Sequence, residues 1–318
     1  MLPRRFFRES ALAVLLAVLA GMGGCGNDSD KVVVDFSQTV PVARPGAGPA
    51  RNPPLRVAVS SMISPKETFI HYRHLLSYIA RRLDRDLEFV QRKTYGEIDE
   101  LLGKGLIDLA FICSGPYIAG KDRYGFAPLA VPEVHGSHFY RSYLIVNRNS
   151  PFQRLEDLRG HSFAFTDPDS NTGRLVPTYW LAQMNEQPET FFGRIIFTYS
   201  HDNAIMAVAR GLVDGAAVDG LIWDFYQAKN PYFTSKTRII KKSEPYGIPP
   251  LVASRQLPGE SKERIRQLLL AMHLDPEGKR LLDELMIDRF IPLEEDWYDT
   301  LRQMNQRLDR GKGPIHAP

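Results

Sequence analysis

The sequence has few cysteines. Only Cys25 and Cys113 occur among its 318 residues, so no framework of several disulfides can hold the fold together. Cys113 stands in the apolar run LIDLAFICSG, which predicts a buried, small apolar side chain. The fold must therefore depend on a hydrophobic core, and 318 residues with 43% hydrophobic content are enough for one or, on length, about two domains.

A strong charge of one sign is also missing. Lys and Arg total 40 against 37 Asp and Glu, which gives a formal net charge of +3. No long basic run occurs of the kind that neutralises the phosphates of a nucleic acid. We therefore expect no nucleic acid partner.

Common catalytic motifs are missing as well. There is no G-x-S-x-G, no C-x-x-C and no H-E-x-x-H, so the patterns of serine hydrolases, thiol oxidoreductases and zinc proteases are not met. Two histidine pairs, His71 with His74 and His135 with His138, could ligate a metal, but no set of carboxylates or cysteines at ligand spacing accompanies them. We expect no metal, no other cofactor and no enzymatic activity.

The N-terminus has the features of a targeting segment. Three arginines, at positions 4, 5 and 8, precede the apolar run ALAVLLAVLA, which is too short to span a bilayer as a permanent helix. The following GMGGC resembles the bacterial lipoprotein signal, in which the cysteine is diacylated and becomes the new N-terminus. We expect a signal peptide over residues 1–24 and a lipid on Cys25, with a simple cleaved export signal as the alternative. In either case the mature chain is exported to the periplasmic or cell-surface side.

A tether and then an α/β pattern follow. Residues 25–54 are polar and then rich in Pro, Gly and Ala (PVARPGAGPARNPP), a composition typical of a flexible linker. From Leu55 short apolar strands alternate with amphipathic helices, and in ETFIHYRHLLSYIARRL apolar residues recur every three or four positions. This alternation predicts the α/β class with a largely parallel sheet.

Two such α/β series are joined by a long extended stretch, FYRSYLIVNRNS. After a second extended stretch, KTRIIKKSEPYGIPPLVAS, the pattern becomes wholly helical. We expect a first lobe that begins with residues 55–142, a second lobe over residues 143–240, and a return to the first lobe with C-terminal helices over residues 241–318. Ligands usually bind between such lobes, at the carboxyl ends of the strands.

One predicted helix start, FTDPDSNTGRLVP, has more hydrogen-bonding side chains than capping requires. Ser170, Asn171 and Thr172 stand there together. A helix start presents free N–H groups and about half a positive charge, so it is suited to an anion. Gly173 would let the backbone approach a ligand, and Pro177, in the second turn if Thr172 is the N-cap, predicts an irregular start. The alternative is a helix cap with turn residues and no ligand.

This stretch resembles the ligand-binding signature of the phosphate/phosphite/phosphonate-binding proteins of ABC importers, the PhnD-like family. Three further blocks are similar and stand in the same order: YGEIDELLGKGLIDLAFICSGPYI, NSPFQRLEDLRG and SHDNAIMAVARGLVDGAAVD. The resemblance covers residues 55–298. It implies an α/β, two-lobed type II periplasmic-binding-protein fold with extended crossover hinges and a helical C-terminal tail.

The resemblance also implies six ligand-binding residues: Tyr95, Tyr117, Ser170, Asn171, Thr172 and His201. The triplet would hold the oxyanion, the two tyrosines would reach it from the first lobe, and the histidine would open a helix of the second lobe. Each has a structural alternative, as a helix cap, a core aromatic or a half-buried imidazole. Asp219, at the end of a predicted strand, either faces the cleft or caps a helix.

We therefore expect a monomeric, lipid-anchored solute-binding receptor that delivers a small phosphorus oxyanion to an ABC permease. Alternatives are another small anion, delivery to a sensor kinase, or a hydrolase of small phosphoesters. Family members that take aminoalkylphosphonates carry acids where this chain has Leu221 and Pro250-Leu251. A buried ammonium without a partner is unfavourable, so the sequence predicts phosphate, phosphite or a short alkylphosphonate rather than 2-aminoethylphosphonate.

Replacing Cys25 by serine tests the lipid anchor. Two acyl chains hold a protein stably on a membrane and a processed polypeptide end does not, so we expect Cys25→Ser to move the protein from the membrane fraction to the soluble fraction. The measurement is immunodetection in fractionated cells, with Cys113→Ser as the matched control. Membrane association that survives the Cys25 change would contradict the anchor.

Overall fold

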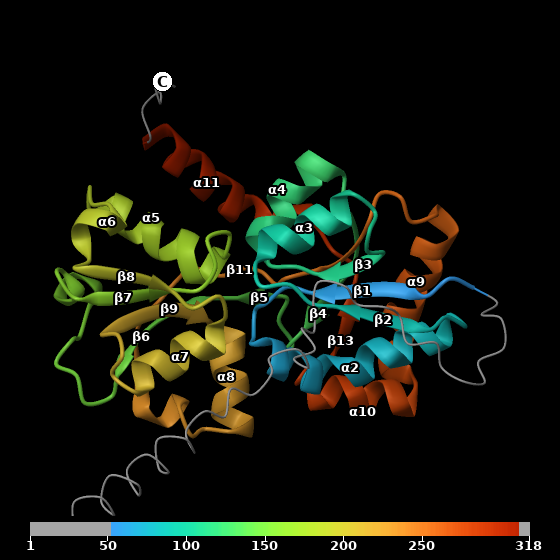
Figure 1. Ribbon diagram of the computed structural model, residues 1–318, viewed down its shortest axis with the longest axis horizontal. Helices are drawn as coiled ribbons and strands as arrows, with labels where there is room; N and C mark the ends of the chain where they lie inside the picture. The colour runs from blue at the N-terminus through green and yellow to red at the C-terminus, as the bar shows by residue number, and fades with distance from the viewer. Residues whose placement is uncertain (1–51, 312–318) are drawn as a thin grey trace, which may run out of the picture. The chain divides into compact units, whose positions relative to one another are not determined.

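The computed structural model describes residues 52–311 and confirms the expected α/β class, with two lobes each built on a sheet (Figure 1). The signal peptide predicted over residues 1–24, the acylated Cys25 and nearly all of the predicted tether lie outside these residues. Within residues 52–311, no helix is both long and apolar enough to cross a membrane.

The first lobe has a six-stranded sheet in the order β13-β4-β12-β3-β1-β2. β1 is parallel to β2 and β3, whereas β12 and β13 are antiparallel to their neighbours. The strands are β1 (Leu55–Val59), β2 (Leu87–Val90), β3 (Leu109–Phe111), β4 (Ala127–Glu133), β12 (Leu251–Ala253) and β13 (Arg289–Ile291). The expectation of a largely parallel sheet was wrong, because the C-terminal strands return from the second lobe and run in the opposite direction.

The second lobe has a five-stranded sheet in the order β10-β6-β9-β7-β8. Its strands are β6 (Ser142–Asn147), β7 (Ser162–Phe165), β8 (Arg194–Phe197), β9 (Gly215–Asp219) and β10 (Thr237–Lys242). The two extended crossovers between the lobes pair with each other as β5 (Phe139–Tyr140) and β11 (Tyr246–Gly247), which are antiparallel. The residue limits predicted for the lobes stay predictions.

Helices cover both faces of each sheet (Figure 1). In the first lobe α3 and α4 lie on one face and α2 and α10 on the other, and in the second lobe α5 and α6 lie opposite α7 and α8. The helices are α2 (Pro65–Arg82), α3 (Tyr95–Gly103), α4 (Ser114–Tyr124), α5 (Val176–Gln183), α6 (Pro188–Phe191), α7 (His201–Ala209), α8 (Gly220–Lys229), α9 (Gly259–Ala271), α10 (Pro276–Glu284) and α11 (Asp299–Gly311). Short 3-10 turns are η2 (Leu155–Leu158), η4 (Thr234–Lys236), η5 (Met272–Leu274) and η6 (Glu295–Tyr298).

Local sequence explains where α3 begins. Thr94 Oγ1 accepts the Glu97 N–H at 3.3 Å, and the Glu97 carboxylate accepts the Thr94 N–H at 2.9 Å. This reciprocal pair is a capping box, which satisfies two N–H groups that a helix start leaves free. It fixes Tyr95 as the first residue of the helix, at the edge of the first lobe.

The buried core is continuous between the lobes. One apolar cluster contains Ile98 from the first lobe, Phe163 from the second, and Ile248 and Tyr298 from the C-terminal part. The Tyr298 hydroxyl donates to the Ile248 carbonyl at 2.7 Å, so η6 is tied to the returning crossover. The C-terminal part is helical as expected, apart from β13, whose three residues pair with β4.

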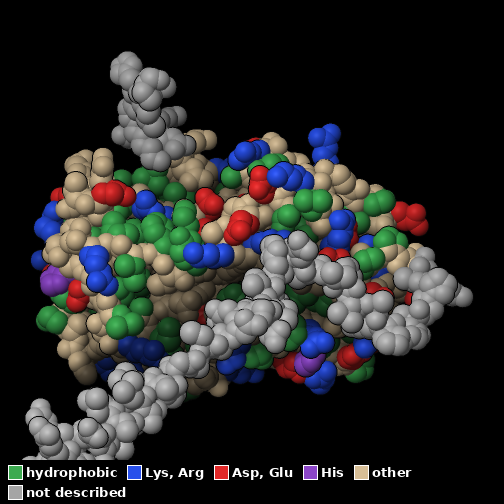
Figure 2. Space-filling model, in the orientation of Figure 1, with side chains coloured by type: hydrophobic (Ala, Val, Ile, Leu, Met, Phe, Trp, Pro, Cys, Tyr) green, Lys and Arg blue, Asp and Glu red, His purple; other side chains and the backbone are tan. Residues whose placement is uncertain are grey.

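The surface carries both signs of charge. On the face drawn in Figure 2, Lys and Arg side chains are interspersed with Asp and Glu, without a large area of one sign. A mixed surface of this kind gives no extended electrostatic footprint for a nucleic acid backbone.

Candidate functional site

The triplet lies where β7 passes into α5. A π-helical turn, η3 (Asn171–Leu175), precedes the α-helix, and Ser170 rather than Thr172 is its N-cap. Ser170 Oγ accepts the Gly173 N–H at 3.0 Å. One of the three polar side chains therefore caps the helix, which leaves the other two for a different role.

Pro177 and Gly173 set the shape of this turn. Pro177 has no N–H and cannot bond the Gly173 carbonyl, which accepts the Thr166 N–H at 3.3 Å instead. A Cβ at Gly173 would lie 1.8 Å from Thr166 Oγ1, so only glycine fits against the end of β7. The irregular start predicted from Pro177 is confirmed.

All three side chains of the triplet are fully buried. Asn171 Nδ2 donates to the Tyr140 hydroxyl at 3.1 Å, and the Thr172 carbonyl accepts from Ser142 Oγ at 2.7 Å. Within the described part of the chain, Thr172 Oγ1 and Asn171 Oδ1 have no hydrogen-bond partner.

His201 is buried at the start of α7. Its Nδ1 accepts the Asp219 N–H at 3.0 Å, so the neutral ring carries its proton on Nε2. Burial lowers the pKa of His201 to about 3, which keeps the ring neutral. Among residues 52–311, Nε2 has no hydrogen-bond partner, so its N–H is a buried donor without an acceptor.

Tyr95 contributes a second buried donor from the first lobe. Burial, together with the nearby Cys113 and Asp167, raises the pKa of Tyr95 well above its ordinary value, so the phenol stays protonated. Its backbone N–H donates to Asp167 Oδ2 at 3.1 Å across the two lobes. Its hydroxyl lies near the Ser170 side chain, but no group in the described residues meets it with hydrogen-bond geometry.

These groups belong to a set that we call the open polar atoms: buried side-chain atoms near the triplet without a hydrogen-bond partner within residues 52–311. They are Ser60 Oγ, Tyr95 Oη, Thr166 Oγ1, Asn171 Oδ1, Thr172 Oγ1, Ser200 Oγ and His201 Nε2. A buried polar atom that lacks a partner costs about 1–3 kcal/mol. Several together indicate a site for a ligand that accepts many hydrogen bonds.

The open polar atoms come from the facing edges of the two lobes. Ser60 follows β1 and Tyr95 opens α3, whereas Thr166 follows β7 and His201 opens α7. The His201 N–H donates to the Met62 carbonyl at 2.9 Å, which brings the end of β1 against α7. The site therefore combines strand ends with helix starts, the arrangement that favours anions.

Tyr117 lies apart from this group. Its hydroxyl donates to Glu295 Oε1 at 2.8 Å, and its ring centroid is 4.9 Å from that of Tyr298. The structure thus brings Tyr95, the triplet and His201 together but directs Tyr117 towards the C-terminal segment.

Two residues that the sequence did not single out lie beside the candidate site. Tyr140 contacts Asn171 from β5, and Ser60 carries an open polar atom at the end of β1. The signal for Ser60 is the polar pair that ends the apolar run LRVAVSS, at a carboxyl strand end. Tyr140 has no comparable signal, because only the pairing of β5 with β11 places it.

Asp219 both caps α8 and faces a hollow between the lobes. Its Oδ1 accepts the N–H groups of Leu221 at 2.8 Å and Ile222 at 3.4 Å. Burial raises the pKa of Asp219 to about 7. The hollow, of about 100 Å³, is mostly apolar, and its lining includes Met62, Tyr72, Asp219, Leu221, Ile222, Asp224, Ile248 and Pro249.

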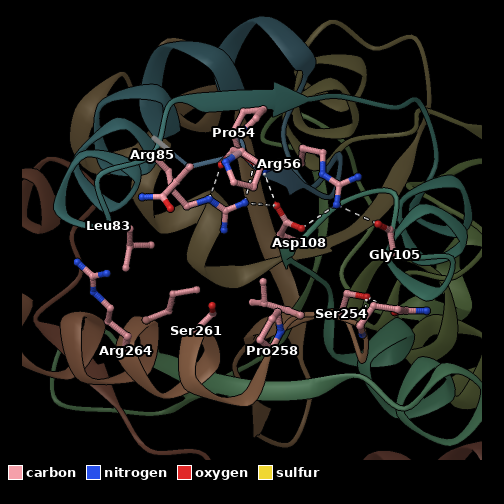
Figure 3. A pocket seen from close by; sticks show the side chains of 15 residues that line it. Pro54, Arg56, Leu83, Arg85, Gly105, Asp108, Ser254, Pro258, Ser261 and Arg264 are labelled. Carbon is pink, nitrogen blue, oxygen red and sulfur yellow. Dashed lines mark hydrogen bonds and ion pairs between the residues drawn. The ribbon is translucent and has the colours of Figure 1, made fainter. Parts of the chain in front are cut away.

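A larger hollow, of about 560 Å³, lies away from the site (Figure 3). Arg56 and Arg85 line it, and both donate to the Asp108 carboxylate, at 2.8 Å and 3.1 Å. Arg56 stands near the start of β1, whereas Ser60 follows its end. These guanidinium groups already have a carboxylate partner, so this hollow is a weaker candidate for an anion than the open polar atoms.

One histidine of each pair noted in the sequence has a local partner. His71 Nε2 lies 3.3 Å from Glu67 Oε2, and the His138 ring stacks on Trp297 at 4.0 Å between centroids. Across residues 52–311, no three His, Cys, Asp or Glu side chains gather in a way that could hold a metal ion.

The arrangement is suited to binding. His201 cannot act as a general base, because its acceptor nitrogen already takes the Asp219 N–H. The seven open polar atoms belong to neutral side chains, so neutral donors and helix starts would hold the charge of an anion. Asp99 Oδ1, on α3, is also buried without a partner within residues 52–311, and burial raises the pKa of that carboxyl to about 7.

A sequence profile described as "ABC transporter, phosphonate, periplasmic substrate-binding protein" matches residues 57–298. The chain is 27% identical over 184 residues to a probable ABC transporter phosphite binding protein PhnD1 of Prochlorococcus marinus, covering 54% of this chain and 62% of that one. It is 30% identical over 154 residues to the phosphonates-binding periplasmic protein of Escherichia coli, covering 47% and 45%. The matches thus span from under half to about three fifths of these relatives.

Solved structures show the same fold. A binding protein component of an ABC phosphonate transporter from Pseudomonas aeruginosa superposes with a TM-score of 0.77 at 24% identity, covering 83% of this chain and 90% of that one. PhnD1 of Prochlorococcus marinus in complex with methylphosphonate gives a TM-score of 0.70 at 20% identity, covering 80% and 98%. The two-lobed fold and the profile match over most of the described residues agree, and the chain belongs to the family of periplasmic substrate-binding proteins of phosphonate ABC transporters.

Proposed function

We propose that this protein captures a small phosphorus oxyanion between its lobes. The observation that carries the proposal is the set of open polar atoms at the facing strand ends and helix starts. A tetrahedral oxyanion presents several acceptor oxygens at once, so one ligand can satisfy Tyr95 Oη, Thr172 Oγ1 and His201 Nε2 together. Membership of the family, and relatives named for phosphite and phosphonates, support phosphorus as the central atom.

One open polar atom, an amide oxygen, can accept a hydrogen bond but cannot donate one. Asn171 Oδ1 has no N–H or O–H to accept within residues 52–311, while Asn171 Nδ2 is held by Tyr140. A ligand that still carries one proton, such as a hydrogen phosphonate or hydrogen phosphate ion, would supply that O–H. This chemistry favours phosphorus oxyanions over sulfate, which carries no proton at neutral pH.

The protein would act as a carrier. We propose that it is exported, is held at the membrane through a lipid on Cys25, works as a monomer, and passes its ligand to an ABC permease. Family membership supports an exported binding protein that serves a transporter, and His201, whose Nδ1 accepts the Asp219 N–H, supports binding rather than hydrolysis.

Thr172→Val tests the site with little disturbance of the fold. Valine keeps the shape of the side chain and removes a hydroxyl that has no partner in residues 52–311. We expect methylphosphonate affinity to fall by about 1–3 kcal/mol, the range for hydrogen bonds to a charged group, with an unchanged melting temperature. Calorimetric titration and a thermal melt measure the two quantities.

Thr234→Val is the matched control for Thr172→Val. Thr234 Oγ1 is also buried and lacks a partner in the described chain, but it lies in η4 beside α7 and α8. We expect this variant to bind normally. Ser170→Ala should differ from both, because Ser170 Oγ caps Gly173 and its loss lowers stability as well as affinity. Normal affinity in Thr172→Val would contradict the proposed site.

The apolar hollow beside Asp219 bears on the organic group of the ligand. Of the positions where the sequence lacks an acid, Leu221 lines this hollow, whereas Pro250 and Leu251 do not. Two carboxylates do face it, but Asp219 accepts two helix N–H groups and Asp224 accepts the Tyr143 hydroxyl at 3.0 Å. An ammonium would have to leave water beside a carboxyl that burial keeps partly protonated at neutral pH, whereas a methyl group would not.

We expect methylphosphonate to bind more tightly than 2-aminoethylphosphonate in side-by-side calorimetric titrations at pH 6 and pH 8. Tighter binding of the aminoethyl compound would contradict this preference. If Asp219 were its partner, affinity for the amine would rise between the two pH values, because a carboxyl with a pKa of about 7 is mostly protonated at pH 6 and ionised at pH 8.

A further inference from the structure

Another hollow is lined by Ser200, one of the residues that carry open polar atoms. It has a volume of about 490 Å³ and lies between the loop that follows β2 and the loop that precedes α7. Its lining comprises Ser61, Pro65, Gln91, Arg92, Lys93, Thr198, Tyr199, Ser200 and Asn203. Both lobes therefore contribute to it.

Two exposed cations stand in this hollow. The Lys93 ammonium lies 4.3 Å from the centroid of the Tyr199 ring, across the lobes, and Arg92 donates to the Gln91 carbonyl at 2.7 Å. Within residues 52–311 neither forms an ion pair with a carboxylate, unlike Arg56 and Arg85 in the hollow of Figure 3. Their charge therefore acts on whatever enters the hollow.

The nearby carboxylates are engaged by backbone N–H groups. Glu97 accepts from Thr94 in the capping box of α3, and Asp202 Oδ1 accepts the Ser64 N–H at 2.8 Å. These hydrogen bonds hold both carboxylates at helix starts. Hydrogen bonds from Thr94, with a smaller contribution from the Arg92 charge, lower the pKa of Glu97, so Glu97 offsets part of that charge.

The hollow also contains the start of α7. Ser200 is the N-cap, its side chain makes no capping bond, and its Oγ is an open polar atom although the residue is only 1% exposed. Ser200 directly precedes His201, and the Tyr199 N–H donates to the Thr166 carbonyl at 2.8 Å. Among the residues that carry open polar atoms, Ser200 lines the hollow, His201 follows it in the chain, and Thr166 is hydrogen-bonded to the lining residue Tyr199.

We propose that Arg92, Lys93 and the start of α7 form a second anion-binding site, where a small oxyanion is held on its way to the open polar atoms. The proposal rests on the proposed function. Two other hollows lie nearby. The one beside Asp219 is apolar and carries two carboxylates. The one beside Ser170, of about 800 Å³, presents acids as well as arginines: Asp99, Asp169, Glu186, Glu189, Arg123, Arg174 and Arg307. Positive charge at the mouth of a cleft raises the rate of association with anions, and salt weakens the effect.

The double variant Arg92→Gln with Lys93→Gln tests this site by stopped-flow fluorescence with methylphosphonate. We expect the association rate constant at low ionic strength to fall about 3- to 10-fold and its dependence on salt to flatten. The dissociation rate constant should stay within about twofold, because these side chains guide the ligand and do not hold it in its final position. The matched control replaces Lys262 and Arg266 by glutamine; both lie on α9 and line neither cleft hollow.

An unchanged association rate and salt dependence in the double variant would overturn the inference. A change confined to the dissociation rate would also overturn it, because the two cations would then contact the ligand in its final position. No binding of methylphosphonate, phosphite or phosphate by the unmodified protein would contradict the proposed function itself, so the two failures can be told apart.

Discussion

Buried hydrogen-bond donors that the two lobes leave without an acceptor are the constraint on which this structure depends. Tyr95 Oη, Thr172 Oγ1 and His201 Nε2 are each removed from water and have no partner within residues 52–311. At about 1–3 kcal/mol for each such atom, these donors weaken the contact between the lobes. A ligand that accepts several of these hydrogen bonds would favour the state in which the lobes touch, so binding and closure are linked.

Short-range features of the chain produce this constraint. Pro177 lacks an N–H and Gly173 lacks a Cβ, so the turn before α5 packs directly against Thr166 at the end of β7. The Asp219 N–H holds the His201 ring in one tautomer from the neighbouring strand. The donors are thus oriented by groups that would not touch the ligand, which lowers the entropy that binding must remove.

Sequence predicted the parts of this arrangement that have a local signature. The triplet at a helix start, the irregular turn at Pro177 and the alternation of strands and helices are all properties of contiguous residues. The sequence predicted Tyr117 as a ligand-binding residue and did not single out Tyr140. Both are tyrosines near a predicted strand. Only the pairing of β5 with β11 brings Tyr140 to Asn171, and no local pattern indicates that pairing. The short strand β13 was not predicted for the same reason. Its three residues show no periodicity, and they form a strand only because they pair with β4.

A crystal structure of the protein with methylphosphonate tests the central claim most directly. We expect phosphonate oxygens about 2.6–3.1 Å from Tyr95 Oη, Thr172 Oγ1 and His201 Nε2, the range for hydrogen bonds to an anion. A phosphonate bound instead in the hollow of Arg56 and Arg85, with the three donors still lacking a partner, would contradict it.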